Sequence, residues 1–223
     1  MGYSFDFSSV LGYSAVLLKG ILITVELTLI GGLLGVALGI LCAWTRSFGP
    51  RWGRWIATAY IEMIRNTPFL VQLFFVFFGL PALGLRLSEM QAASLAMVLN
   101  LGAYSAEIIR AGIQATAKGQ FEAGVSLGMT QLQTFRYVVL LPSLQRIWPA
   151  LSSQIVIVML GSAVVSQIAV EDLSFAANFI QSRNFRAFEM YFVTTALYLA
   201  LAFLLRLILS RIGIHLFARR VAR

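Results

Sequence analysis

Three polar side chains share one face of an otherwise apolar stretch. Asn100, Tyr104 and Glu107 are separated by four and three residues, the spacing of neighbours on a helix surface. Polar groups in an apolar helix face a bundle interior or a watery cavity rather than lipid. We interpret the three residues as one wall of a path for a polar solute. A set of interhelical hydrogen bonds explains them equally well, so both interpretations stay open.

A second polar group lies around Pro68. Glu62 and Arg65 are three residues apart, so they can pair on one helix face. Pro68 cannot donate a helical hydrogen bond and leaves a carbonyl free one turn earlier. We therefore expect a kink at Pro68, with Asn66 and Thr67 as substitute partners for the freed backbone. Such a kink either opens backbone toward a path or has only a structural role.

Residue types that would support catalysis are sparse. No Gly-x-x-x-x-Gly-Lys-Ser/Thr sequence occurs, so the chain lacks a P-loop for ATP. His215 is the only histidine and Cys42 the only cysteine, which leaves no metal-ligand cluster, no intrachain disulfide and no persuasive Ser/His/Asp set. We expect this chain to be no enzyme and to bind no cofactor or metal.

The elements that must position these residues are membrane spans. Hydrophobic residues make up 59% of the 223 residues and charged residues 12%, with a mean hydropathy of +0.84. A helical span needs about 20 apolar residues, and we predict five, at about 20–45, 55–80, 88–112, 146–170 and 187–210. Lone strands would leave backbone groups unpaired in lipid. The sequence therefore predicts an all-α integral membrane protein with a single domain over residues 1–223.

The charges predict the orientation of these spans. With the N-terminus outside, the outer segments hold only four basic residues, and the inner segments hold the rest of the 17. The outer four are Lys19, Arg86, Arg183 and Arg186. This bias is the one that the positive-inside rule describes. We predict a periplasmic N-terminus and a cytoplasmic C-terminus. The basic tail at 219–223 either contacts anionic lipids or only anchors the topology without a specific partner. The formal charge of +8 therefore implies no nucleic-acid partner.

The first span carries Gly31, Gly35 and Gly39 at intervals of four residues. Small residues at this spacing line one helix face and allow a second helix to approach closely. Glycine is also common in membrane helices in general. We interpret the three as a packing face, either within the bundle or against a second subunit.

Between the third and fourth spans, residues 114–140 are soluble in character. Gly119 and Gly128 bracket a stretch that we predict to be a short amphipathic helix, with Gly128 as its left-handed cap. Glu122 is expected in its first turn, where a carboxylate interacts favourably with the helix dipole. Thr130 and Gln133 have the spacing of a capping box at the start of a second helix. Glu122 either caps its own helix or belongs to a helix that fits a groove on another protein.

These segments together resemble the permease subunits of polar amino acid ABC importers, the histidine/glutamate-type permease family. The resemblance extends from about Gly20 to Arg211. It is carried by residues 61–68, by Val71-Gln72-Leu73-Phe74-Phe75, by residues 103–114, and by the loop with Glu122-Ala123-Gly124 and Leu141-Pro142. It implies five spans in a bacterial inner membrane and a pair of permease subunits. It also implies two cytoplasmic ATPases, which hold the ATP and Mg²⁺, and a periplasmic amino acid-binding protein.

The resemblance assigns roles to individual residues. Contact with the ATPase is implied for the coupling helix residues Gly119, Phe121, Glu122, Ala123, Gly124, Leu127 and Gly128. Our candidates for the substrate path are Thr67, Gln72, Asn100, Tyr104 and Ser162.

The chain departs from the family pattern at three places. Gly124 stands where a second alanine is usual, and the interval from Gly128 to Pro142 is one residue longer, so the second loop helix is expected to be shifted. Where relatives have a Lys-Asp-Thr-Ser-Leu-like run, this chain has Leu160-Gly161-Ser162-Ala163-Val164. Because the charged pair is missing, we expect a heterodimer in which a sister permease supplies the more complete substrate site.

Two other classes of function remain as alternatives. A self-sufficient secondary transporter or channel would need its own coupling-ion site, for which Glu26 and Glu107 are the candidates. A membrane scaffold or receptor would transport nothing. Dependence of uptake on a separate ATPase distinguishes the three hypotheses.

Overall fold

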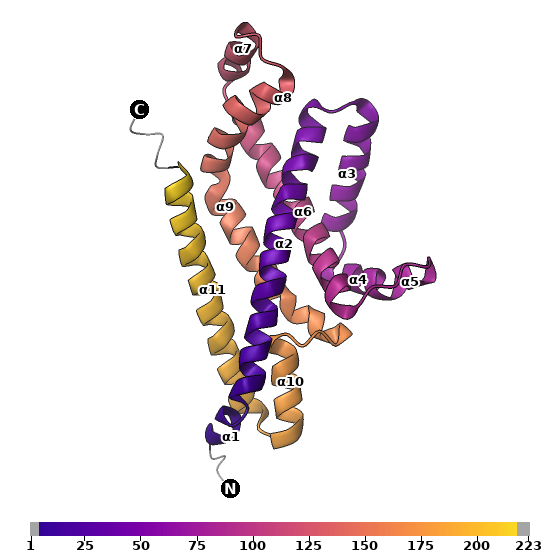
Figure 1. Ribbon diagram of the computed structural model, residues 1–223, viewed down its shortest axis with the longest axis vertical. Helices are drawn as coiled ribbons and strands as arrows, with labels where there is room; N and C mark the ends of the chain where they lie inside the picture. The colour runs from indigo at the N-terminus through magenta and orange to yellow at the C-terminus, as the bar shows by residue number, and fades with distance from the viewer. Residues whose placement is uncertain (1–4, 218–223) are drawn as a thin grey trace.

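The computed structural model describes residues 5–217, and within that range it contains only helices, turns and connecting segments. The predicted lipid-binding tail at 219–223 lies outside the described residues. The long helices run along the length of the molecule, with the first described residues at one end and the last described residues near the other (Figure 1). The loop helices α7 (Lys118–Ser126) and α8 (Gln131–Gln133) lie at the second end, which we call the α7 end.

Within residues 5–217, four segments are long and apolar enough to cross a membrane. They are α2 (Ser14–Phe48), α6 (Glu89–Gln114), the segment Gln131–Ile168 and α11 (Ala187–Phe217). The segment Gln131–Ile168 combines α8 (Gln131–Gln133), a π-helix (Thr134–Val139), α9 (Leu140–Gly161) and a 3₁₀ segment (Ser162–Ile168). These spans agree with four of the five that the sequence predicts.

The remaining predicted span, at about 55–80, is broken. α3 (Arg51–Arg65) meets the segment Phe69–Ala82 at an angle of 113°. That segment comprises α4 (Phe69–Phe74), a π-helix (Phe75–Gly79) and α5 (Leu80–Ala82). The expected kink at Pro68 is therefore a sharp corner, and α4 and α5 run across the direction of the long helices (Figure 1). The pair counts as a fifth span only if the two parts are taken together.

Three short helices complete the fold. α1 (Ser8–Leu11) precedes α2, α7 (Lys118–Ser126) follows α6, and α10 (Leu173–Asn184) lies beside the start of α2. Asp172 caps α10 by accepting from the Phe175 amide at 2.9 Å, and it also accepts from the Tyr198 hydroxyl at 3.0 Å. Burial raises the pKa of the Asp172 carboxyl to about 6. These bonds join α10 to α11 at the end opposite α7.

The packing of α2 against α6 forms the centre of the bundle. Gly31, Gly35 and Gly39 are all buried and face α6. A Cβ atom built on Gly35 would lie 2.9 Å from the Leu101 Cβ, and one on Gly39 would lie 2.5 Å from the Ser105 Cβ. Real Cβ atoms do not approach so closely, so the glycines allow the two helices to touch. The packing face that the sequence predicts lies within this chain.

Candidate functional site

The corner at Pro68 is held by side-chain hydrogen bonds to backbone carbonyls at the end of α3. Thr67 Oγ1 donates to the Met63 carbonyl at 2.8 Å and to the Ile64 carbonyl at 3.4 Å, so Thr67 acts as the substitute partner that the sequence suggests. Asn66 Nδ2 donates to the Glu62 carbonyl at 2.8 Å, but this carbonyl also accepts the Asn66 backbone amide, so it is not freed by the proline. The Ile64 carbonyl lies four residues before Pro68, and Gln72 Nε2 donates to it at 2.7 Å.

Gln72 lies behind the corner, where it is 8% exposed. Its Nε2 also bonds the Thr67 carbonyl and hydroxyl at 3.0 Å, and its Oε1 accepts from Asn100 Nδ2 at 2.9 Å. Both ends of the Gln72 amide are therefore hydrogen-bonded within the protein, and Gln72 connects the corner to α6. The sequence does not reveal this connection, because Asn100 is distant from Gln72 along the chain.

A groove of about 440 Å³ opens beside this corner. Thr67 from the corner and Asn100 and Tyr104 from α6 contribute polar side chains, and Gln154 from α9 completes the polar part of the lining. The rest is Pro68, Phe69, Ile157, Val158 and Gly161. The structure thus brings together three of the five predicted path residues in a surface with neutral hydrogen-bonding groups on an apolar background.

Ser162 does not belong to this groove. Its side chain is fully buried at the start of the 3₁₀ segment, and its hydroxyl donates to the Met159 carbonyl at 2.7 Å. Gln154, by contrast, was missing from the predicted path residues. The dense run of Ser152, Ser153 and Gln154 was the available signal, but helical spacing alone does not say which of the three faces α6.

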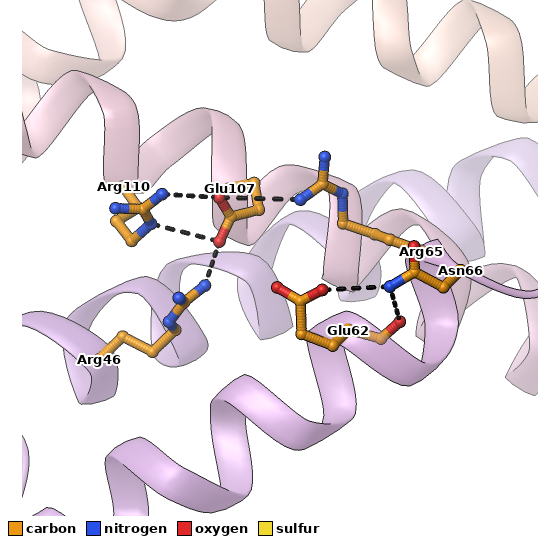
Figure 2. A network of polar contacts seen from close by, with 6 residues as sticks. All are labelled: Arg46, Glu62, Arg65, Asn66, Glu107 and Arg110. Carbon is orange, nitrogen blue, oxygen red and sulfur yellow. Dashed lines mark hydrogen bonds and ion pairs between the residues drawn. The ribbon is translucent and has the colours of Figure 1, made fainter.

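An arginine cluster lies next to the groove (Figure 2). The Glu107 carboxylate forms ion pairs with three arginines from three helices: Arg46 of α2, Arg65 of α3 and Arg110 of α6. The nitrogen–oxygen distance is 3.8 Å for Arg65 Nη1 and 2.8 Å for Arg110 Nη2. The Arg65 guanidinium also lies over the Tyr104 ring, 5.7 Å from its centroid. Three cations around one carboxylate tie α2, α3 and α6 together beside a residue that lines the groove.

The cluster corrects one prediction from the sequence. Arg65 points to Glu107 on another helix, whereas the Glu62 carboxylate accepts from Asn66 Nδ2 at 3.1 Å (Figure 2). The expected pairing of Glu62 with Arg65 is therefore wrong, because a more buried carboxylate competes for the guanidinium. The cluster also bears on the ion-coupled alternative, since Glu107 is occupied by three arginines and Glu26 lies on an exposed face of α2.

The loop helix α7 begins one residue earlier than the glycine pattern suggests. Its N-cap is Ala117, so Gly119 lies inside the first turn and Glu122 falls in the second. The predicted position of Glu122 at the helix start is therefore wrong, and the dipole argument does not apply to it. The side chains of Glu122 and Ala123 are exposed, which leaves the Glu122 carboxylate available to a partner.

The C-terminus of α7 and the start of α8 match the prediction. Gly128 adopts φ +72°, and its amide donates to the Val125 carbonyl while the Met129 amide donates to the Gly124 carbonyl. This is the Schellman arrangement with glycine in the left-handed position. Thr130 and Gln133 form the expected capping box. A π-helix over Thr134–Val139 follows before Pro142.

One side of α7 packs on the protein and the other is exposed. Phe121 lies 6.1 Å from Phe48 between ring centroids, and Gly124 is buried. Val125 and Leu127 are 71% and 75% exposed. Two apolar side chains at the tip of a protruding loop have no role in the fold of this chain, and such exposure is typical of an interaction surface.

Gly124 allows α7 to contact the following π-helix. A Cβ atom at this position would lie 2.7 Å from Thr134 Cγ2 and 2.8 Å from Thr134 Oγ1. Thr134 is itself buried, so it has little room to move. Because Gly124 has no side chain, the α7 backbone can lie against the Thr134 side chain at this point.

We expect Gly124→Ala to destabilise the loop by about 1–3 kcal/mol, because overpacking a buried contact has costs of that size. Adding Thr134→Ala should recover most of the loss, since it removes both atoms that the new methyl group would meet. Limited proteolysis of the loop in detergent measures the effect. Gly119→Ala is the control, because nothing lies within 4 Å of its Cβ position. Equal protease sensitivity of Gly124→Ala and wild type would contradict the assigned contact.

Residues 35–223 match the family model described as "Binding-protein-dependent transport system inner membrane component". The chain is 34% identical to the glutamine transport system permease protein GlnP of Escherichia coli (strain K12) over 210 residues, which is 93% of this chain and 96% of that protein. It is 35% identical to the L-cystine transport system permease protein TcyB of Bacillus subtilis (strain 168), over 93% of this chain and 87% of the other.

Solved structures show the same fold. A crystal structure of an amino acid ABC transporter with histidines superposes with a TM-score of 0.84 at 36% identity, over 96% of this chain and all of that one. An inward-facing structure of the MetNI methionine ABC transporter has a TM-score of 0.75 at 20% identity, over 90% of this chain and 96% of the other. The second likeness concerns the fold alone.

Proposed function

Because the chain belongs to the family of binding-protein-dependent transport system inner membrane components and is a permease component of an amino acid ABC importer, we propose that it carries polar amino acids inward with a second permease subunit. The groove supports the polar substrate class, because Thr67, Asn100, Tyr104 and Gln154 offer neutral donors and acceptors. An amino acid carries an ammonium and a carboxylate, and both need such partners once water is removed.

The second permease is inferred from the incomplete groove. The groove opens at the surface of this chain. Ser162, the polar residue of the run that aligns with the family's Lys-Asp-Thr-Ser-Leu-like run, is buried away from it. A sister subunit that faces the groove would supply the opposing wall. We infer a heterodimer because the charged pair of the family pattern is absent from this chain.

The single observation that carries the coupling proposal is the exposed apolar face of α7. Val125 and Leu127 project from the α7 end, where the C-terminal part of α11 also lies (Figure 1). We infer that this end is cytoplasmic, that α7 is the coupling helix of a cytoplasmic ATPase, and that the opposite end receives the periplasmic binding protein. Closure of two ATPases would then switch the bundle between outward and inward openings.

Purification of the assembly from its host in mild detergent tests this function. We expect a co-purifying ATPase and a second permease, and ATP-dependent amino acid uptake after reconstitution of the assembly with its binding protein. The same vesicles without internal ATP are the control. Uptake by the chain reconstituted alone would contradict the proposal and favour the ion-coupled transporter.

A further inference from the structure

A second cavity, of about 580 Å³, lies between α9 and α11, apart from the groove. Its polar lining consists of Gln145, Ser152 and Ser153 from α9 and Arg206 and Ser210 from α11. The side chains of Gln145, Ser153, Arg206 and Ser210 are exposed, so the cavity opens at the surface of the bundle. Its residues differ from those of the groove, and nothing in the proposed transport cycle uses them.

The cavity exists because a large side chain holds the two helices together at one point. Trp148 Nε1 donates to the Leu209 carbonyl at 2.9 Å, and the indole packs so closely on Gly213 that a Cβ there would lie 2.4 Å from Nε1. The Trp148 ring also contacts Phe217 edge-on at 5.6 Å between centroids. The contact is fixed by this tryptophan, and the neighbouring small residues Ser152, Ser153 and Ser210 leave space beside it.

One charged group in this space lacks a partner in the described part of the chain. Arg206 is the only charged residue of the lining, its side chain is exposed, and it forms no ion pair with residues 5–217. An arginine within a span normally pairs with an anion or reaches the interface. The Ser152 Oγ atom is enclosed by the protein, so the exposed hydroxyls beside Arg206 are those of Ser153 and Ser210. One bound anion can pair with the guanidinium and accept from these two hydroxyls.

The surroundings indicate the kind of anion. Arg206 lies in the C-terminal half of α11 and is followed there by Arg211, while Arg136 and Arg146 lie in the first half of the segment Gln131–Ile168. Basic pockets between spans on the cytoplasmic side attract the phosphates of anionic lipids. Val156 and Ile214 line the cavity itself and offer an apolar surface for acyl chains. We propose that this cavity binds the phosphate group of an anionic phospholipid through Arg206, with Ser153 and Ser210 as additional hydrogen-bonding partners.

A lipid in this site would contact α9 and α11 at the same time. α9 contributes Gln154 to the groove and the preceding Ser152 and Ser153 to the cavity. The phosphate would therefore hold the helix that forms one wall of the proposed path against α11. The lipid site rests on the cytoplasmic orientation inferred under the proposed function, but not on the substrate or on the second permease, and it can be tested on the chain or on the intact assembly.

Native mass spectrometry of the purified assembly with added phosphatidylglycerol tests the proposal. We expect a tightly retained phosphatidylglycerol on the wild type and at least a tenfold weaker retention on Arg206→Gln. Arg206→Lys should be intermediate, because lysine keeps the charge and loses the planar donor geometry. The matched control is Arg211→Gln, since Arg211 lies on the same helix in a surface groove and does not line the cavity. That control should retain the lipid as the wild type does.

Each outcome decides the proposal. Equal retention by wild type and Arg206→Gln, or equal loss in the Arg206 and Arg211 variants, would overturn it. Inorganic phosphate that displaces the lipid at millimolar concentration would overturn the lipid assignment in favour of a free-anion site. If Arg206→Gln fails to assemble, Ser153→Ala with Ser210→Ala replaces it, and unchanged retention by that variant would also overturn the proposal. Cross-linking of Ser153→Cys to the sister permease in the intact assembly would show that protein, rather than lipid, covers the cavity.

Discussion

Leu127→Lys at the C-cap of α7 is expected to lower ATP-driven uptake by about 30-fold or more. The Leu127 side chain is 75% exposed in this chain, so little of its apolar surface is used by the fold. If it enters a groove on the ATPase, a charged replacement removes an apolar anchor and buries an ammonium. Residues at the centre of interfaces contribute about 2 kcal/mol or more, which corresponds to that factor.

The stability of the chain itself should change little, because substitutions at exposed positions have effects within about 0.5 kcal/mol. Lysine is also acceptable at the C-terminus of a helix. Leu127→Met is the control, since methionine keeps the apolar surface, and it should retain uptake and the co-purifying ATPase. Full uptake by Leu127→Lys in an assembly of normal composition would exclude Leu127 from the coupling contact.

The apolar pattern of the sequence is sufficient for the long helices, because a span is determined by about 20 consecutive residues. The same holds for the local signals in the loop. Gly128 and Thr130 act on the backbone within four residues, and the structure places them as a left-handed cap and a capping box. Such features are local, so they could be predicted without knowledge of the fold.

The features that were missed depend on contacts between distant segments. Gln72 bonds Asn100, which is 28 residues away, and Arg46 bonds Glu107, which is 61 residues away. Helical spacing suggested that Arg65 pairs with Glu62, but it gives no information on a stronger acceptor from another helix. The sharp angle of the corner at Pro68 was missed for a similar reason, because the Gln72 side chain that bonds the Ile64 carbonyl lies eight residues further along the chain.

The largest effect on the fold is expected at Gly39. A Cβ atom at this position would lie 2.5 Å from the Ser105 Cβ and 3.0 Å from the backbone nitrogen of Ala106. Since backbone cannot rotate away, Gly39→Leu must separate α2 from α6. Overpacking of a core typically costs about 1–3 kcal/mol, and for leucine we expect the upper end of that range. The apparent melting temperature in detergent should fall by roughly 10 °C, and uptake should be lost because the groove residues Asn100 and Tyr104 lie on the displaced helix.

Gly32→Ala is the matched control for this prediction, because it adds a methyl group to a neighbouring face of the same helix. The nearest atom to its Cβ position is Ile155 Cγ2 at 3.9 Å, an ordinary contact. Alanine is also favoured over glycine within a helix by about 0.5–1 kcal/mol, so this variant should melt at or above the wild-type temperature. If Gly39→Leu and Gly32→Ala instead had similar melting temperatures, then α2 and α6 would not be in the close contact described, and the three glycines would have to serve an interface with a second subunit. Melting curves of the two variants therefore decide between the two packing roles that glycines at this spacing can have.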